Sequence, residues 1–532
     1  MILIICLDGL DPDLVAELRR DGRLPNLTEL AAKGVSGRLR SSFPPASIPA
    51  WSTFLTGVGP DRHGLFDFTA LEGGRIRFQN AADRQVPTLL ELLDAAGRRV
   101  CCIGVPSTYP VSDLTRGAML AGFDSPFTGK PDPAALHPLE LWQRLRREGL
   151  DLRTSTLPEG RKGRGWHAAA RDRVLESVER RLAQAKRLLA EGPWDLFCVH
   201  FQAADTAGHH FWRYFDSSSA RHDGSRAELA SVVPDVYDAL DRAVGELRCV
   251  IPDDALCIAL SDHGMGPASD RVVHLNRWLE QQGFLVRRRS GAARAAGVLR
   301  DAALGWLPRE LQSLLFRGLR GNAAAGVETA LRLGEIDTES SAGFSEESST
   351  LPGVWILEPR RREELIRKLR AWEAVTRVYR REDLYRGPLR SRAPHLLLEL
   401  RHGLVRTPPR YTGPACRQLR SGELDGVRGA GLNGVHRPDG LLYASGGPVS
   451  ASRSASQSIS DAWIGDLAPT LLAALEVPIP AWMEGKPLQA LAPAPRWSEQ
   501  SPRVRPRAAG ARLSASQAAR LERRLRALGY LG

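Results

Sequence analysis

Short apolar runs alternate along the chain with segments in which apolar residues recur at helical spacing. The runs span residues 2–7, 99–105, 195–201 and 255–260, and a later one spans 441–444. Continuous apolar runs of this length are typical of strands buried on both faces, so the alternation predicts a mainly parallel sheet covered by helices on both sides. Each run is followed within a few residues by Asp, Gly or Pro, at the edge where open α/β sheets bind ligands.

The pattern becomes irregular between residues 272 and 428. Basic and Gly-rich stretches there surround two isolated strand-like runs, 354–357 and 396–400. We interpret 272–428 as a cap inserted into one discontinuous core, which would comprise residues 1–271 and 429–489.

Three further segments have compositions of their own. Residues 106–165 are richer in Pro and Gly, which predicts a second, smaller insertion. Residues 490–511 are crowded with Pro, Arg, Ala and Ser, as in a linker. Within 512–532, a short amphipathic helix is predicted from about Ser514 to Leu528.

The composition is that of a globular protein with a basic surface. The 532 residues suggest two to four structural units, and 43% hydrophobic with 25% charged residues exclude a disordered or fibrous chain. The formal net charge of +12 could attract an anionic ligand. The excess Arg is dispersed among acidic residues, as in 360–364, and no aromatic residues interleave with it, so no nucleic-acid polymer is expected as a partner.

The cysteines and the first residues bear on the cellular compartment. The seven cysteines lie mostly inside apolar runs and show no short metal-ligand spacing, which predicts reduced core residues. The chain enters an apolar strand at once, without a basic leader, and no apolar run approaches the ~20 residues of a transmembrane helix. We therefore expect no transmembrane segment and a cytoplasmic location.

Asp8 and Ser47 are the first candidate functional residues. Asp8 ends the first apolar run, where its carboxylate would project from the sheet edge, although Asp in this place is also common in caps and turns. Ser47 lies where a loop enters a helix, with Pro49 in the first turn. Free backbone N–H groups and the helix dipole there would stabilise an alkoxide and phosphate oxygens, although a plain capping Ser fits the same pattern.

Two later segments carry Asp and His at spacings that suit a metal ion. Asp205 and His209 lie four residues apart, so a helical turn or compact loop would bring both to one ion; buried pairing without metal is the alternative. The neighbouring His210 does not have this spacing. Asp262 and His263 follow an apolar run and precede a Gly-rich turn, and core packing explains adjacent polar residues at a strand end poorly.

His436 completes the candidate set, from a loop just before the last apolar run. A single loop His is usually a surface residue, so its weight comes from the other candidates. Three Asp, three His and one Ser in all lie at or near the ends of predicted strands. Mixed oxygen and nitrogen ligands are typical of zinc or manganese and unlike a thiolate-bound structural site.

These motifs together resemble the type I phosphodiesterase and nucleotide pyrophosphatase family within the alkaline phosphatase superfamily. The resemblance runs from Asp8 to Leu488, with gaps through the predicted cap. The matching runs are Asp8-Gly9, Ser47-Ile48-Pro49-Ala50-Trp51, Thr56-Gly57, His63-Gly64, 205–209, Asp262-His263-Gly264-Met265, Gly434-Val435-His436, 466–471 and 478–480. The fold that it implies is an alkaline-phosphatase-like three-layer α/β/α sandwich with a mainly parallel central sheet and an inserted cap.

The resemblance also implies a function and its ligands. The activity would be metal-dependent hydrolysis of a small phosphorylated substrate, as a phosphodiesterase, nucleotide pyrophosphatase or phosphomonoesterase, through a phosphorylated Ser47. Two divalent ions roughly 4 Å apart, zinc or manganese, would clamp the attacking and leaving oxygens. The implied ligands are Asp205, His209 and His436 for one ion, and Asp8, Asp262, His263 and the bridging Ser47 for the other.

The sequence departs from related enzymes at two positions that bear on the substrate. Many diesterases of the family have a Thr nucleophile and an Asn that holds a phosphate oxygen, whereas no Asn closely follows Ser47, so the choice between monoester and diester stays open. Sulfatases need a modifiable Cys or Ser followed by Pro and Arg at fixed offsets. Ser47 and Pro49 fit that pattern, but Trp51 stands in the Arg position, which argues against a sulfatase.

Two other functions compete with hydrolysis. A phosphomutase or phosphotransferase resembling cofactor-independent phosphoglycerate mutase would use the same metals and a Ser. A binding module that kept the fold and lost turnover is the other, and the presence of all seven candidate residues argues against it.

Overall fold

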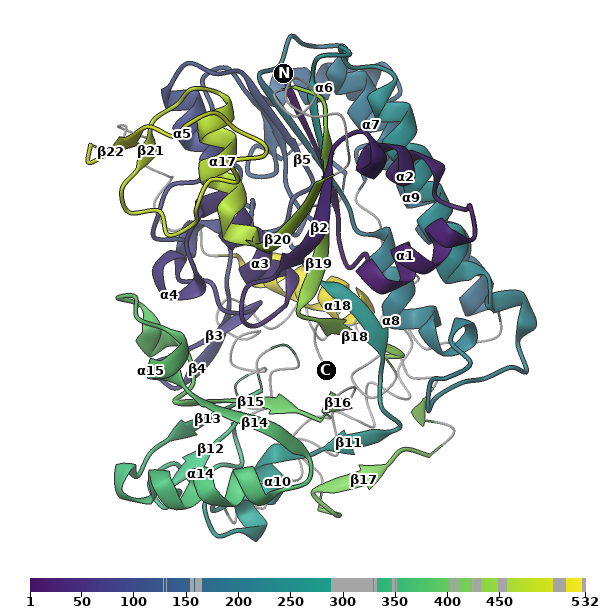
Figure 1. Cartoon of the computed structure of the whole chain (residues 1–532). Coiled ribbons are helices and arrows are strands. Elements are labelled where there is room, and N and C mark those ends of the chain that lie inside the picture. The colour runs from purple at the N-terminus through teal and green to yellow at the C-terminus, as the bar shows by residue number, and fades with distance from the viewer. Residues whose placement is uncertain are drawn as a thin grey trace.

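A nine-stranded sheet forms the centre of the computed structural model (Figure 1). The structure describes residues 1–127, 129–130, 132–153, 157, 165–288, 329, 333–346, 350, 352–401, 405–406, 412–420, 423–424, 432–447, 457–500 and 513–528. Across the sheet the strands are β20 (Gln457–Trp463), β2 (Val35–Arg40), β19 (Asp439–Ser445), β9 (Leu256–Leu260), β1 (Ile2–Leu7), β8 (Leu196–Phe201), β5 (Val100–Ile103), β6 (Ala118–Leu120) and β7 (Leu136–His137). All run parallel to β1 except β19 and β7, which confirms the predicted mainly parallel sheet.

Both faces of the sheet are buried, because successive side chains of its central strands enter two different cores. In β1, Leu3 and Ile5 pack into one hydrophobic cluster, whereas Ile2 and Ile4 pack into the other. This alternation is the period of two that a strand imposes on its side chains. A strand with apolar partners on both faces must be apolar throughout, which explains the continuous apolar run.

Helices cover each face of the sheet and make it the middle of three layers (Figure 1). The first face carries α1 (Pro12–Arg20), α2 (Pro25–Ala32), α6 (Leu139–Arg147), α7 (Trp166–Leu189), α8 (Ala203–Phe215), α9 (Val232–Arg248) and α18 (Ala515–Leu528). The second carries α3 (Ser47–Thr56), α5 (Leu89–Ala95) and α17 (Leu467–Ala474). Among the described residues, no helix is both long enough and apolar enough to cross a bilayer.

Helix α18 packs against the first layer, although it comes at the end of the chain. Leu521, Leu525 and Leu528 are buried in the first cluster. Arg524 donates hydrogen bonds to backbone carbonyls of the 123–127 loop, among them that of Ser125. The helix lies within the predicted range 512–532, whereas residues 501–512, which include half of the predicted linker, lie outside the described residues.

A smaller sheet with a core of its own lies beside the central layers, at the bottom of Figure 1. The runs predicted as isolated strands, 354–357 and 396–400, form β13 (Gly353–Ile356) and β15 (Leu396–Leu400). They pair with each other, and with β12 (Gly343–Phe344) and β14 (Val375–Arg380), in an antiparallel order β12-β13-β15-β14. Helices α10 (Leu275–Gln281) and α14 (Arg362–Ala371) share its hydrophobic core. The boundaries of the cap stay a prediction.

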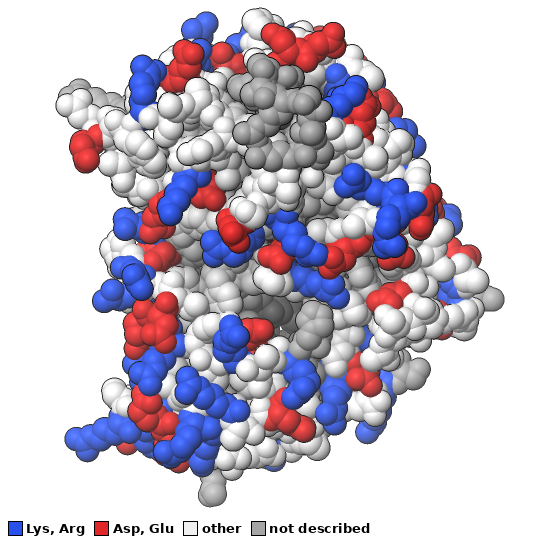
Figure 2. Space-filling model, in the orientation of Figure 1, with Lys and Arg blue, Asp and Glu red and all other residues white. Residues whose placement is uncertain are grey.

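The range predicted as a smaller insertion, 106–165, contributes to the central sheet. It supplies β6 and β7 at one edge, followed by α6. Its limits also stay a prediction. On the face shown in Figure 2, Lys and Arg side chains are interspersed with Asp and Glu.

Candidate metal centre

The carboxyl ends of β1 and β9 place three candidate residues beside one another. The two strands are parallel neighbours, with Cys6 opposite Leu260. Asp8 follows β1 directly, and Asp262 with His263 follow β9 after a single residue. All three are fully buried. The strand register therefore brings together residues that are more than 250 positions apart.

Helix α3 adds Ser47 to these residues. Its N-cap is Ala46 and no side chain caps the helix, so Ser47 is the first helical residue and not a capping Ser. The Ser47 hydroxyl donates to Asp8 Oδ1 at 3.2 Å, and its Oγ lies 3.4 Å from His263 Nε2. His263 Nε2 lies 3.4 Å from Asp262 Oδ2. We call Asp8, Ser47, Asp262 and His263 the strand group.

The other three candidates form a second cluster, which we call the helix group: Asp205, His209 and His436. Asp205 and His209 lie one turn apart on α8, and His436 lies on β18 (Gly434–Arg437). His436 was predicted in a loop, but it pairs with Met265 of the short antiparallel strand β10 (Gly264–Pro267). Three distances define the cluster: 3.2 Å from His209 Nε2 to Asp205 Oδ1, 3.1 Å from His436 Nε2 to Asp205 Oδ1, and 3.0 Å between the two Nε2 atoms.

Gly9 allows the two groups to lie close together. Its φ of +69° lies in the left-handed region, and a Cβ on it would stand 2.8 Å from Cα and Cβ of Asp205. The backbone N–H of Asp205 donates to the carbonyl of Asp8 at 3.0 Å. Because only Gly fits such an approach, the start of α8 sits directly against the end of β1.

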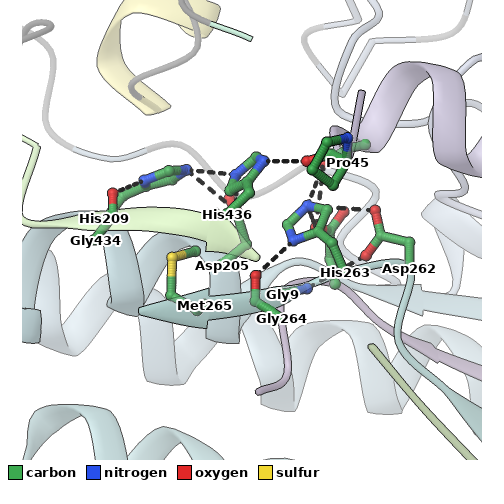
Figure 3. A network of polar contacts seen from close by, with 12 residues as sticks. Gly9, Pro45, Asp205, His209, Asp262, His263, Gly264, Met265, Gly434 and His436 are labelled. Carbon is green, nitrogen blue, oxygen red and sulfur yellow. Dashed lines mark hydrogen bonds and ion pairs between the residues drawn. The ribbon is translucent and has the colours of Figure 1, made fainter. Parts of the chain in front are cut away.

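The three His of the two groups share one hydrogen-bonding pattern (Figure 3). In each, Nδ1 lies within hydrogen-bond distance of a backbone carbonyl: Gly434 for His209, Pro45 for His436 and Gly264 for His263. A carbonyl can only accept, so Nδ1 carries a proton in each ring and Nε2 faces the site, where it can hold a cation in place of a proton of its own. This arrangement is typical of metal-ligating His.

The strand group disfavours the ionised form of Asp262. Burial raises the pKa of Asp262 well above its usual value, and the nearby carboxylates of Asp8 and Asp205 raise it further. Burial lowers the pKa of His263 to about 4, and His436 contributes, so this imidazole is neutral. Asp262 Oδ2 is buried without a hydrogen-bond partner among the described residues. Such an orphaned carboxylate oxygen suits a cation ligand.

The helix group is electrostatically more balanced. Burial would raise the pKa of Asp205, but His209 and His436 outweigh it and hold that pKa well below its usual range. Conversely, burial lowers the pKa of His209, and Asp205 more than offsets this and raises it. One carboxylate and two imidazoles can therefore pair with one another without a cation.

The geometry of both groups fits divalent metal ions. The ligand atoms stand 3.0–3.5 Å apart within each group, and the edge of a tetrahedron around zinc is about 3.3 Å at zinc–ligand distances of about 2.0–2.1 Å. Asp8, Asp262 and His263 offer ligand atoms that all lie within 4.8 Å of one another, and so do Asp205, His263 and His436. The rings of His263 and His436 stack at 3.8 Å between centroids, so the two groups adjoin.

The sequence reasoning missed two residues that hold Asp8. His200 Nε2 and Trp51 Nε1 lie 2.9 Å and 3.1 Å from Asp8 Oδ2, which leaves Oδ1 facing Ser47. His200 Nε2 donates to the carboxylate oxygen of Asp8 that does not face Ser47, so it positions this carboxylate. The sequence offered one signal for His200, which is that it is a polar residue inside the apolar run 195–201. His210 lies outside both groups, and its ring packs against Trp166.

Comparison with known proteins places this chain in a family. A family model described as type I phosphodiesterase / nucleotide pyrophosphatase matches residues 2–413. No curated protein sequence matches the chain.

Several solved structures share the fold. Phosphonoacetate hydrolase from Sinorhizobium meliloti 1021 in complex with phosphonoformate superposes with a TM-score of 0.55 at 14% identity, over 89% of this chain and 95% of that chain. Its complex with phosphonoacetate gives a TM-score of 0.53 at the same identity and coverage. Murine ectonucleotide pyrophosphatase / phosphodiesterase 5 gives a TM-score of 0.49 at 13% identity, over 90% and 95% of the two chains. The first two likenesses support the expected alkaline-phosphatase-like fold.

Proposed function

The chain belongs to the type I phosphodiesterase / nucleotide pyrophosphatase family and is a hydrolase of phosphoester bonds in small phosphorylated substrates, and from this premise we propose that Ser47 is its nucleophile at a site for two divalent metal ions. One observation supports this proposal above all. In His209, His263 and His436, a backbone carbonyl accepts a hydrogen bond from Nδ1, and Nε2 faces the site.

Each group of side chains would hold one ion. The helix group supplies one carboxylate and two imidazoles, and the strand group supplies two carboxylates, one imidazole and the Ser47 hydroxyl. Carboxylate and imidazole ligands without thiolates suit zinc or manganese. When bound, the two ions supply positive charge that lowers the pKa of the Ser47 hydroxyl and stabilises charge on the transferring phosphoryl group.

Helix α3 prepares Ser47 for attack. The first hydrogen bond of the helix runs from Ala50 N to Ala46 O, so the backbone N–H groups of Ser47 and Ile48 precede it and can bind phosphate oxygens, aided by the helix dipole. In the first step the bond between Ser47 Oγ and phosphorus forms as the ester bond breaks, and the leaving oxygen takes up a proton. Water then cleaves the phosphoserine, which releases phosphate or a phosphomonoester and restores the hydroxyl.

Ser47→Ala tests the nucleophile directly. We expect kcat/KM on nitrophenyl mono- and diesters, assayed with zinc or manganese, to fall by at least about 10³-fold, because the covalent route is removed. Ser52→Ala is the matched control, since Ser52 is buried on the same helix and belongs to neither group; it should retain activity. Brief incubation with substrate followed by acid quenching and mass spectrometry should find phosphate on Ser47. Full activity in Ser47→Ala would reject the assignment.

A further inference from the structure

A small cavity lies behind the strand group, at the carboxyl ends of β5 and β8. Its volume is about 20 Å³, and its walls include Gly104, Phe123, Arg153, Arg180, Arg181 and His200. His200 belongs to both places, because it lines the cavity while its Nε2 donates to Asp8 Oδ2. The cavity is therefore one imidazole ring away from the candidate metal centre. Ligands of open α/β sheets bind at this edge.

The cavity wall has more positive than negative charge. Arg153 and Arg180 share the carboxylate of Asp151, at 2.7 Å and 3.1 Å. Arg181 forms no ion pair with a carboxylate among the described residues, and its hydrogen bond there runs from Nη1 to Gln184 Oε1 at 2.9 Å. One guanidinium at the cavity thus lacks a counter-charge within the described part of the chain.

Gly104 leaves room for this guanidinium to lie against the end of β5. Its φ is +75°, and a Cβ on it would lie 2.7 Å from Cζ and Nη2 of Arg181. Burial lowers the pKa of Arg181 to about 10, and the neighbouring Arg180 contributes. Arg181 is partly buried, and withdrawing part of a guanidinium from water without an opposite charge is unfavourable, so an anion in the cavity would offset this cost.

We infer that Arg181 binds a compact inorganic anion of the halide class in this cavity. A space of about 20 Å³ suits one or two water-sized species, since one needs about 10–15 Å³, and this favours a halide over a nucleotide or sugar phosphate. The guanidinium supplies the charge and the N–H donors. The site is separate from the proposed phosphoryl site and does not depend on turnover.

Bromide titration tests the site without relying on catalysis. The protein would be Ser47→Ala, chelated and held at constant ionic strength with sodium gluconate, and its thermal unfolding followed. We expect bromide to raise Tm saturably by about 2 °C or more, as binding to the native state requires. Arg181→Gln should remove the saturable rise, and Arg181→Lys should weaken it. Arg171→Gln, on the same helix and paired with Asp172, should leave it intact.

Anomalous diffraction from bromide-soaked wild-type crystals locates the ion independently of any variant. A peak beside Arg181 and Gly104 would support the inference. A saturable effect that persists in Arg181→Gln would overturn it, and so would crystals without a peak in the cavity. A rise with inorganic phosphate but not with bromide would overturn the halide assignment.

Discussion

The helix group and the strand group lie side by side but differ in how they are built and charged. The strand group stands at the ends of two central strands and the start of α3, and all four of its residues are fully buried. The helix group comes from α8 and from β18, outside the central sheet, and His436 is partly exposed. The strand group has two carboxylates and one neutral imidazole, whereas the helix group has one carboxylate and two imidazoles.

This difference leads us to expect that the two groups depend on cations to different degrees. In the helix group, His209 and His436 already stabilise the ionised form of Asp205. In the strand group, Asp8 and Asp262 repel each other, and burial raises the pKa of Asp262. We therefore expect metal binding to relieve electrostatic repulsion chiefly in the strand group. In the proposed mechanism catalysis would still require both groups, because the two ions would act on the same phosphoryl group.

Asp262→Asn should have the largest effect on activity. It removes a ligand charge from the strand group, and we expect kcat/KM to fall by at least about 10³-fold, equivalent to about 4 kcal/mol. Metal analysis of the zinc-replete protein should fall from two ions per chain to about one. His209→Gln should also lose one ion.

Asp254→Asn is the matched control for this experiment. Asp254 is an exposed residue just before the amino end of β9, the strand whose carboxyl end leads to Asp262. The control should keep two ions and full activity. Two bound ions in an inactive Asp262→Asn protein would contradict the assignment of Asp262 as a ligand.

Substitutions in the two groups should change the free energy of unfolding of the metal-free protein in opposite directions. In chelated protein at neutral pH, Asp205→Asn should destabilise by about 3–5 kcal/mol, because breaking a buried pair leaves His209 and His436 without their carboxylate. Asp262→Asn should stabilise the chelated protein, because burial and the neighbouring carboxylates disfavour the ionised form of Asp262 in the folded state, whereas the unfolded chain ionises it freely at neutral pH. Its amide oxygen can still accept from Gly9 N, and its amide nitrogen can donate to His263 Nε2.

Denaturant unfolding of both variants with and without chelator measures this contrast. Zinc should stabilise the wild type more than either variant, through its preferential binding to the native state. Equal destabilisation of both chelated variants would show that charge balance does not distinguish the groups.

The sequence predicted the parts of the site that depend on local pattern. The apolar runs ending in Asp8 and Asp262 identified parallel strands, and parallel neighbours necessarily present their carboxyl ends at one edge. The spacing of Asp205 and His209 allowed a helical turn, and α8 provides it.

The parts that depend on long-range pairing could not be predicted. His436 reaches the site because β18 pairs with β10, about 170 residues earlier, and no local pattern encodes that register. The strands β13 and β15 looked isolated for the same reason. The contact between His200 and Asp8 follows from the register of β1 and β8, in which Cys6 lies opposite His200.

Replacing His200 should weaken metal binding by the strand group and leave metal binding by the helix group unchanged. His200 is a positioning residue, because its Nε2 donates to Asp8 Oδ2. Residues that orient a metal ligand typically contribute 10–100-fold to affinity or activity. We expect His200→Leu to weaken one of the two zinc-binding steps by about 10–100-fold. It should also lower kcat more than it changes KM, because Asp8, which accepts from the Ser47 hydroxyl, would lose its orientation.

His200→Gln should restore part of that loss, because a Gln side chain can place an amide N–H near the position of Nε2 and donate to Asp8. His210→Gln is the control: His210 is also buried, but its ring packs on Trp166 and it is a member of neither group, so both zinc-binding steps should persist. Zinc titration by calorimetry separates the outcomes. If His200→Leu weakened both steps equally, or if His200→Gln recovered nothing, then His200 would support the fold as a whole and the two groups would not be independently held.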